Sequence, residues 1–506
     1  MPVNKQDSNL TGLRIAEEAS LKVLPGSPVW YPLEPNSYKD FGGQIKTVAR
    51  EPINNSRQRL KGTTTDLDAS GGLNQDLTMT NLIRPLQGFF FADLRQKAST
   101  QPMNGAAVTI SSVTNADSKY NTAAAPGTYL AGHLVLASGF SATANNGIKH
   151  VASFDSNDIT VTETLADETP AATAKVEVVG FQGASGDITM NVTGNVVTLH
   201  STALDFTTLG LLAGEWFFLG GDTTTTQLGT NIGLCRIALG GIAAHVITLD
   251  KTQFVATTDA GTGKTVQMFF GNVLRNEPAY TDIKRRTYQV ERQLGQDDDG
   301  TMAEYLVGAV ANELTINVPQ ADKVNVDITY IALDNEQHTG VDGLKAGSRP
   351  NSTSEDAINT SSDVKRINLS LVSNDTHVTP LFAFVTTLDV SINNNVTPLK
   401  AVSVLGAFNT STGTFEASGK MTAYFATIAA VKAVRNNADV TLDMFFGKAN
   451  KGMLIDLPLI SLGDARLQVE KDKPIMLPLD TNAAMSPFGY TALMMFFPYL
   501  PTIAMG

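Results

Sequence analysis

The chain repeats itself at two scales, and this feature restricts its fold more than any other. Residues 71–92 (GGLNQDLTMTNLIRPLQGFFFA) and 413–434 (GTFEASGKMTAYFATIAAVKAV) each contain a Gly-marked turn, an alternating strand and a helical segment. Residues Thr287–Tyr330 and Thr441–Asp480 then share a series of alternating runs. Duplicated β-units usually build an assembly rather than a single catalytic cleft, so the pattern favours a structural protein over an enzyme.

A second, smaller repeat lies between the two parts of the first large unit. It consists of residues 104–182 and 185–273, in which Tyr129–His133 (YLAGH) corresponds to Leu211–Glu215 (LLAGE). Each copy has the short, regularly spaced runs of a small β-barrel or sandwich of about five strands. Because insertions are tolerated at exposed loops, we expect both copies to be inserted domains that face solvent.

The expected fold is therefore mainly β, with two β-sandwich or barrel domains, each with a flanking helix, and two small inserted β-domains. Between the two large domains, residues 335–363 are polar and nearly free of large apolar side chains, which predicts a long flexible loop or linker. The predicted divisions are 1–100 with 273–335 for the first large domain, 104–183 and 184–272 for the inserts, 336–363 for the linker, and 364–506 for the second large domain.

Local patterns predict individual elements within the large domains. Apolar side chains at helical spacing predict a helix within Asn81–Leu94, and a second helix is expected at Ile428–Asn436. A short strand is expected at Gln44–Ala49, and Gly62–Gly72 is expected to be a loop. Alternation predicts a further strand at Ile53–Lys61, which would place three basic side chains on one face: Arg57, Arg59 and Lys61.

The lead of the chain is expected to be mostly irregular. Residues 1–40 contain four prolines, and Trp30 and Tyr31 are the expected anchors of this lead. The start has no signal-peptide pattern. The apolar closing run is interrupted by Pro498 and Pro501 and is short for a membrane span, so we expect a last strand and a tail that docks on the same or a neighbouring chain.

Composition excludes several classes of function. The net charge is −12, and no Lys/Arg-rich stripe occurs, so specific DNA binding by phosphate neutralisation is not expected. An acidic surface would instead repel DNA. The single cysteine, Cys235, lies in an apolar run and is expected to be a core residue.

Two motifs suggest chemistry, but their spacing is wrong. Thr258–Thr265 (TDAGTGKT) resembles a P-loop, yet Thr258 stands where the first glycine is needed, and a strand rather than a helix follows. The rival interpretation, a nucleotide hydrolase that uses Lys264 and Thr265, can be tested by nucleotide binding. Asp297–Gly300 (DDDG) lacks the other ligands of an EF-hand, so a solvated hairpin turn, or an acidic loop at an assembly surface, is expected.

No catalytic, cofactor or metal site is predicted. The six histidines are scattered, and none has the spacing of a metal site. Several Asn-x-Ser/Thr triplets occur, for example at Asn351, but without a secretory signal they do not indicate glycosylation.

Several segments of the chain resemble the major tail tube proteins of long-tailed, non-contractile bacteriophages. The most specific piece is the Asn393–Asn395 triplet within residues 388–406, which resembles the strand and Asn-rich turn of the family. Residues 283–333 resemble its run of a strand, an acidic loop, a strand with an NxLxLxVP pattern and a last strand; the patterned residues are Asn312, Leu314, Ile316, Val318 and Pro319. Residues 413–445 and the lead TGLRIAEEASLKVLPGSPVWYPLEP are also similar to the family. The resemblance covers about 1–100 and 273–506, and the stretch 101–272 departs from it.

The resemblance implies a β-sandwich with a flanking helix that polymerises into stacked rings. The rings would form a hollow tube in the virion tail, assembled in the host bacterial cytoplasm, through which phage DNA leaves the capsid. Tube proteins of this kind contribute one domain per subunit to a six-fold ring, so two tube-type domains in one chain imply rings of three chains. The implied partners are further copies of the chain, a tape-measure protein, a tail terminator and a tail tip.

The expected contacts between subunits and between rings are charged residues in polar loops: Arg57, Arg59, Lys61, Asp297, Asp298, Asp299, Lys345, Arg349, Glu355 and Asp356. The two terminal arms are expected to contribute to the same contacts. The alternative function is a surface or virion adhesin that binds host glycans through the inserted domains.

Overall fold

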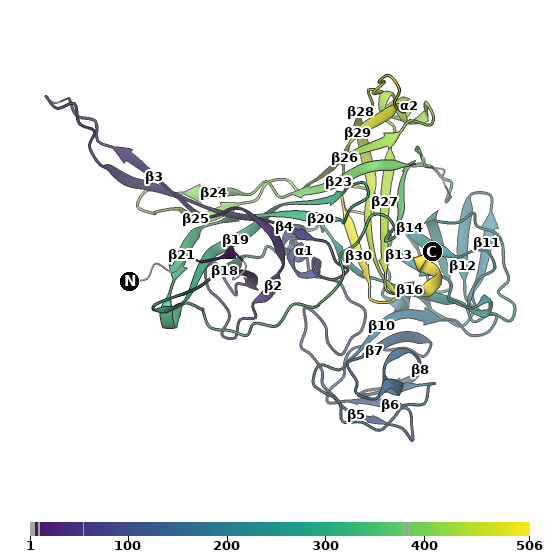
Figure 1. Ribbon diagram of the computed structural model, residues 1–506. Coiled ribbons are helices and arrows are strands. Elements are labelled where there is room, and N and C mark those ends of the chain that lie inside the picture. Colours follow the sequence, from purple (N-terminus) through teal and green to yellow (C-terminus); the bar gives the residue numbers. More distant parts are fainter. Residues whose placement is uncertain (1–5, 9–10, 54, 378–379, 383) are drawn as a thin grey trace.

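The protein is built almost entirely from β-strands in a computed structural model that describes residues 6–8, 11–53, 55–377, 380–382 and 384–506. Within these residues the strands form a 16-stranded sheet, a 12-stranded sheet and a separate two-stranded sheet. Figure 1 shows the large sheet through the middle of the molecule, the 12-stranded sheet at lower right and a long hairpin that projects at upper left. The predicted mainly β fold is confirmed.

Six strand pairings define the first large unit. Strand β18 pairs with β1 and β19; β19 also pairs with β20 and β21; and β4 pairs with β20 and β3, all antiparallel. The helix α1 (Ile83–Phe90) follows β4, and the short strand β2 (Tyr31–Leu33) pairs with β1. The strand bounds are β1 (Gly12–Glu17), β3 (Pro35–Ala49), β4 (Gly62–Asp76), β18 (Tyr288–Asp297), β19 (Gly300–Val318), β20 (Asn325–Ala332) and β21 (Asp334–His338).

The second large unit repeats all six pairings in the same order. Strand β27 pairs with β22 and β28; β28 also pairs with β29 and β30; and β26 pairs with β29 and β23. The helix α2 (Ala429–Arg435) follows β26, as α1 follows β4. The strand bounds are β22 (Val364–Leu371), β23 (Val385–Asn393), β26 (Glu416–Tyr424), β27 (Val440–Lys448), β28 (Lys451–Asp464), β29 (Met476–Ala483) and β30 (Leu493–Phe497).

One hydrophobic core runs through both large units. Along the end of β19, Leu314, Ile316 and Val318 are buried while the residues between them are more exposed, as expected for a strand with one covered face. The predicted helices are confirmed, in shorter form, and both contribute side chains to this core, among them Phe89 and Ala433. The core is therefore shared between the units.

The stretch between α1 and β18, inside the first large unit, forms the 12-stranded sheet. Its strand order is β11-β12-β15-β14-β13-β16-β10-β7-β8-β9-β6-β5, so both predicted inserts contribute to one sheet and meet where β10 pairs with β16. The bounds are β5 (Ile110–Thr114), β6 (Lys119–Thr122), β7 (His133–Ser138), β8 (Gly147–Asp155), β9 (Asp158–Val161), β10 (Lys175–Gln182), β11 (Thr189–Thr193), β12 (Val196–His200), β13 (Trp216–Leu219), β14 (Gly233–Ala243), β15 (Val246–Thr252) and β16 (Gln267–Phe270). A further strand, β17 (Asn272–Arg275), returns to the large sheet beside β30.

The hairpin of β3 and β4 corrects two predictions. Gly62–Gly72 is not a loop but part of β4, which holds its extended form because it pairs with β3 and, over Ala69–Asp76, also with β20. The described residues of Ile53–Lys61 are not a strand but the irregular tip of the hairpin, because strand pairing stops at Ala49 and Gly62. A backbone without a neighbouring strand gains nothing from extension, whatever its alternation of charges.

The lead of the chain is more regular than predicted, whereas the other end has the predicted strand. The lead contains β1 and β2, and Trp30 is the expected anchor: it is fully buried, and its indole N–H donates to the carbonyl of Ala346 over 3.0 Å. At the other end, β30 is the predicted last strand. The tail after it docks on the same chain, where the Asn450 amide donates to the carbonyl of Leu500.

The segment between the large units is packed against both of them. Its first residues belong to β21, and Ile358 is fully buried in the common core. The guanidinium of Arg349 forms an ion pair with the buried Glu291 on β18 at 2.6 Å. The stretch is thus irregular, as predicted, but its side chains anchor it.

Candidate assembly surfaces

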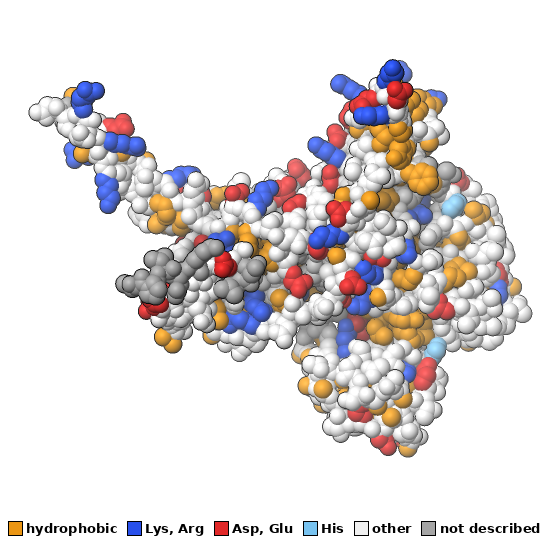
Figure 2. Space-filling model, viewed as in Figure 1, with side chains coloured by type: hydrophobic (Ala, Val, Ile, Leu, Met, Phe, Trp, Pro, Cys, Tyr) orange, Lys and Arg blue, Asp and Glu red, His pale blue; other side chains and the backbone are white. Residues whose placement is uncertain are grey.

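The arm, defined as residues 44–67 of the β3–β4 hairpin, is the most exposed part of the described chain. Its apolar side chains Ile45, Val48 and Leu60 are exposed, and Figure 2 shows Lys and Arg side chains spaced along it. Arg57, Arg59 and Lys61 lie together at its tip, although not on one face of a strand. Exposed apolar and basic groups on an extended arm are features of a surface that contacts another protein.

The base of the arm is held by a small charge cluster. Lys46 pairs with Asp68 across the two strands, and Lys400, from the second large unit, pairs with both Asp66 and Asp68. Hydrogen bonds from Lys400, and for Asp68 also from Lys46, lower the pKa of both carboxyl groups. Because these groups are exposed, their ion pairs add little to the free energy of unfolding. The main role of the cluster is to fix the orientation of the arm.

The acidic turn Asp297–Asp299 lies at the far end of the β18–β19 hairpin. Asp297 accepts hydrogen bonds from the backbone N–H groups of Asp299 and Gly300, and from the Thr339 hydroxyl. These bonds, the one from Thr339 being the strongest, lower the pKa of Asp297. The turn is a rigid, exposed acidic point on the surface, while Asp298 and Asp299 face solvent.

The remaining predicted contact residues lie in the packed segment between the units. Lys345 pairs with Glu336, and Arg349 pairs with Glu291. Glu355 pairs with Lys451 at 2.7 Å, and although burial alone would raise its pKa, hydrogen bonds from Lys451, Thr80 and Thr78 hold it below the usual range. Asp356 is exposed. Three of the four therefore have charged partners within the chain, which sequence reasoning could not show.

The junction between the two large units is a continuation of the sheet. Glu313–Val318 of β19 pair with Leu388–Asn393 of β23. Asn394, which is 1% exposed, closes the junction: its side-chain amide donates to the carbonyls of Phe89 and Ala311, each over 3.0 Å. The middle residue of the Asn triplet is thus a buried link between the first large unit and the second.

The 12-stranded sheet is fixed to the second large unit by a buried ion pair that the sequence did not reveal. Arg236 on β14 is 2% exposed, and its Nη1 lies 3.0 Å from Oδ1 of Asp456 on β28, which is fully buried. The Tyr490 hydroxyl donates to the other carboxylate oxygen over 3.2 Å. Burial raises the pKa of Asp456 to about 6, although the positive charge of Arg236 opposes the shift.

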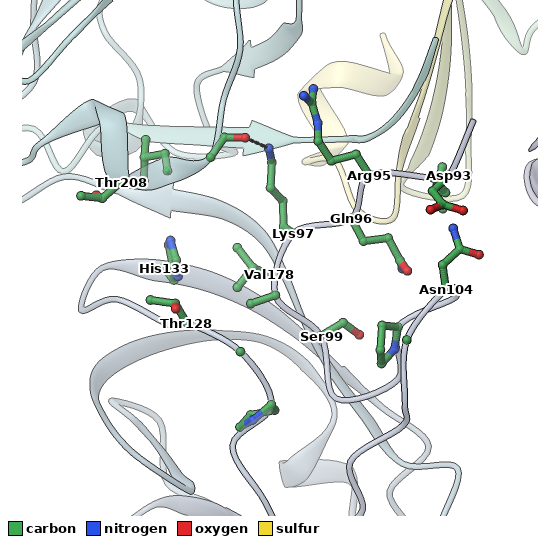
Figure 3. A pocket seen from close by; sticks show the side chains of 18 residues that line it. Asp93, Arg95, Gln96, Lys97, Ser99, Asn104, Thr128, His133, Val178 and Thr208 are labelled. Atoms are coloured by element: carbon green, nitrogen blue, oxygen red, sulfur yellow. Dashed lines mark hydrogen bonds between the residues drawn. The ribbon is translucent and has the colours of Figure 1, made fainter. Parts of the chain in front are cut away.

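A cavity of about 610 Å³ lies where the chain leaves α1 and enters the 12-stranded sheet (Figure 3). Lys97 lines it and donates a hydrogen bond to the carbonyl of Gly210. Arg95 and Lys97 both lie beside the fully buried Glu215, which neutralises part of their charge. Burial, together with the charge of Lys97, lowers the pKa of His133 to about 4, so this ring is neutral at neutral pH. The charged side chains that line the cavity are therefore engaged in ion pairs of the fold, and Asp93 is held by Lys284 and Arg286.

His150 gives the 12-stranded sheet a small pH dependence. A hydrogen bond from its ring to Glu163, at 2.5 Å, raises the pKa of His150 above 6.5 in the folded protein. The resulting stabilisation is complete below pH 6.5 and is lost as the pH rises through the raised pKa. We expect this contribution to the free energy of unfolding to be less than about 1 kcal/mol, because the pair is partly exposed. Urea unfolding at pH 6 and pH 8 should show this loss in the wild type, whereas a Glu163→Gln variant should show almost none.

The motif that resembles a P-loop has an ordinary structural setting. Lys264 pairs with Asp259 at 2.6 Å, beside a turn that leads into a strand. Cys235 is fully buried, as predicted. Among the described residues, no group of three or more His, Cys, Asp or Glu side chains is placed to hold a metal ion. No helix in the described part of the chain is long and apolar enough to cross a membrane.

Comparison with known proteins agrees with this picture of a repeated, assembling β-protein. The family model for phage tail tube proteins matches twice, over residues 8–208 and 177–483. No curated protein matches the chain. The first match includes residues 104–183, so the division into tube units and inserts stays a prediction. Because the two matches together span most of the sequence, the chain belongs to the phage tail tube protein family.

Proposed function

We propose that this chain is the major tail tube subunit of a siphovirus-like phage, and that three chains close each ring. The rings stack into a hollow conduit, through which phage DNA passes during ejection without specific binding. The subunit has a structural role and no catalytic one. Its other partners are the tape-measure protein inside the tube and the terminator and tip proteins at its ends, and assembly takes place in the host cytoplasm.

The duplication of all six strand pairings within one chain carries this proposal. A ring built from tube-type units needs every unit to offer the same edges to its neighbours, because closed symmetry repeats one contact. A chain with two such units supplies two adjacent positions, so six positions need three chains. The 12-stranded sheet, which has no second copy in the chain, would then appear three times on the outside of each ring.

Contacts between rings are assigned to the most exposed charged features. The basic tip of the arm, with Arg57, Arg59 and Lys61, and the acidic turn Asp297–Asp299 carry opposite charges on separate projections. Opposite charges guide subunits into register and favour fast association. Lys345, Arg349 and Glu355 would act at this surface by holding the segment that carries the exposed Asp356.

Seeded assembly tests the proposal. The purified 53.8 kDa chain, mixed with sheared tail fragments of the phage, should shift into large particles in sedimentation velocity, and electron microscopy should show them as hollow tubes. Seeding removes the need for an initiator, so a chain that stays monomeric with seeds contradicts the proposal. A Lys264→Ala variant should assemble as the wild type does, and neither protein should bind ATP.

A further inference from the structure

The contact between the two units within one chain is a template for the contact between chains. Inside the chain, the second unit joins the first when β23 adds to the open side of β19, and Asn394 seals the junction. If each unit makes the same contact with the next, the second unit must offer the equivalent of β19, and the first unit must offer the equivalent of β23. Both equivalents can be found from the strand order.

The equivalent strands are β28 and β3. Gly300 opens β19 and Lys451 opens β28, each directly after the turn of a hairpin. Counting from these residues, Asn317 corresponds to Gln468, and each faces the first residue of the following strand, Asn325 in β20 and Met476 in β29. The paired stretch Glu313–Val318 therefore corresponds to Asp464–Val469, although Asp464 and Ala465 have left-handed backbone angles that interrupt the strand there. Strands β23 and β3 open at Val385 and Pro35, so Leu388–Asn393 corresponds to Tyr38–Gly43.

Neither edge has a second neighbouring strand in the described part of the single chain, although the Arg292 guanidinium donates to the carbonyl of Phe41 over 3.4 Å. Among the described residues, β3 pairs only with β4, and the end of β28, from Ser461 to Asp464, pairs only with β29. Beyond it, Gln468 makes one isolated bridge, and Leu467 and Val469 are exposed, Val469 at 69%. Backbone groups on an open edge strand seek a partner strand, and exposed apolar residues beside them add to the tendency.

The two edges cannot meet within one molecule. In Figure 1, β3 runs from beside β2 and β4 to the upper left, whereas the end of β28 lies beside α2 at upper right. A strand from a second copy must therefore fill each edge, and because the two edges differ, the contact runs head to tail. Such contacts close into a ring or continue as an open filament.

We propose that Tyr38–Gly43 of one copy pairs antiparallel with Asp464–Val469 of the next copy. This inference rests on the proposed function and adds the surface, direction and register of the contact. The internal pair Asn317 with Asp389 transposes to Gln468 with Lys39.

The same template places the arm. In the second unit, β23 continues into the hairpin of β24 (Thr397–Lys400) and β25 (Ala407–Ser411), which lies across the first unit. Lys400 reaches Asp66 and Asp68 there, and Arg285 donates to the carbonyl of Thr410 over 2.7 Å. The arm continues β3 in the same way, so its strands lie across the second unit of the neighbouring copy, and its basic tip remains for the contact between rings.

Cross-linking tests the register. A chain with Lys39→Cys and Gln468→Cys, two exposed positions, is assembled into tubes and oxidised; on a non-reducing gel we expect covalent dimers and trimers. Burial of Cys235 raises its thiol pKa, which keeps this cysteine out of the reaction. The matched control, Lys39→Cys with Ser461→Cys, is out of register by seven residues and should give only monomers.

A second measurement needs no substitution. In wild-type tubes, the backbone amides of both Tyr38–Gly43 and Asp464–Val469 should exchange hydrogen at least tenfold more slowly than in the monomer. Intact tubes in which the designed pair stays monomeric and neither segment is protected would overturn the pairing but leave the tube function standing. Wild-type chains that form no tubes with seeds would instead overturn the proposed function.

Discussion

A chain whose arm is replaced by a tight turn should fold normally but form no tubes. Ile45 pairs with Leu67 across the arm, so replacing residues 46–66 by Asn-Gly joins the two strands through a two-residue hairpin loop. The removed part is mostly exposed, so its loss should change the free energy of unfolding by less than about 1 kcal/mol. Assembly should fall below detection in seeded sedimentation, because the arm supplies contacts to a neighbouring copy.

The matched control is a change of similar exposure away from the proposed contacts. Val196→Lys, at a position 54% exposed on β12 of the 12-stranded sheet, should assemble as the wild type does. The shortened chain keeps Tyr38–Gly43, so it separates the contribution of the arm from that of the strand edge. Tubes of normal length from the shortened chain would refute the role given to the arm.

An Arg236→Met substitution should destabilise the junction of the 12-stranded sheet by about 3–5 kcal/mol, because it leaves the buried Asp456 without its cation. Arg236 also binds Asp250, over 2.8 Å, and its guanidinium lies 5.5 Å from the Trp216 ring. Trp216 is one of two tryptophans in the chain, so its fluorescence should follow the junction in urea unfolding. The first unfolding transition is expected at a lower urea concentration.

Two comparisons give this prediction a specific signature. Arg236→Met combined with Asp456→Asn removes both charges and should recover a large part of the loss. The folded protein already holds the proton of Asp456 more tightly than the unfolded chain, with a pKa of about 6 against 3.8, so stability rises as the pH falls through this window. Without Arg236 this gain should be larger. If the single and double variants lost the same free energy of unfolding at every pH, the broken ion pair would not be the cause of the destabilisation.

The sequence predicts those parts of the fold that depend on local patterns. Alternation along the end of β19 and helical spacing around Phe89 identify a strand and a helix because one face of each is buried. In the arm, Gln44–Ala49 is part of a strand as predicted, but the rest was predicted wrongly, because most of its residues are exposed and burial imposes no pattern on them. Its strands form through pairing of the backbone, which many side-chain sequences allow.

The candidate surfaces were predicted only in part. The Asn triplet could be singled out because it resembles the Asn-rich turn of the tail tube family. Its role as a buried link could not be predicted, because it depends on Phe89, which lies 305 positions away. Arg236 gave no signal, because its partner Asp456 is 220 positions distant and an isolated arginine in a strand is usually exposed. The open edges became visible only once the pairing of every strand was known, since an edge is defined by the strand that is missing.

Averaged cross-sections of the assembled tube test the central claim most directly. Electron micrographs of end-on rings should show a hollow centre, six similar inner lobes and three outer lobes, the last from the 12-stranded sheet of each chain. Three-fold symmetry of this kind would confirm that two tube-type units of one chain occupy adjacent positions. Rings with six outer lobes would contradict it, because each chain would then contribute only one unit to the wall.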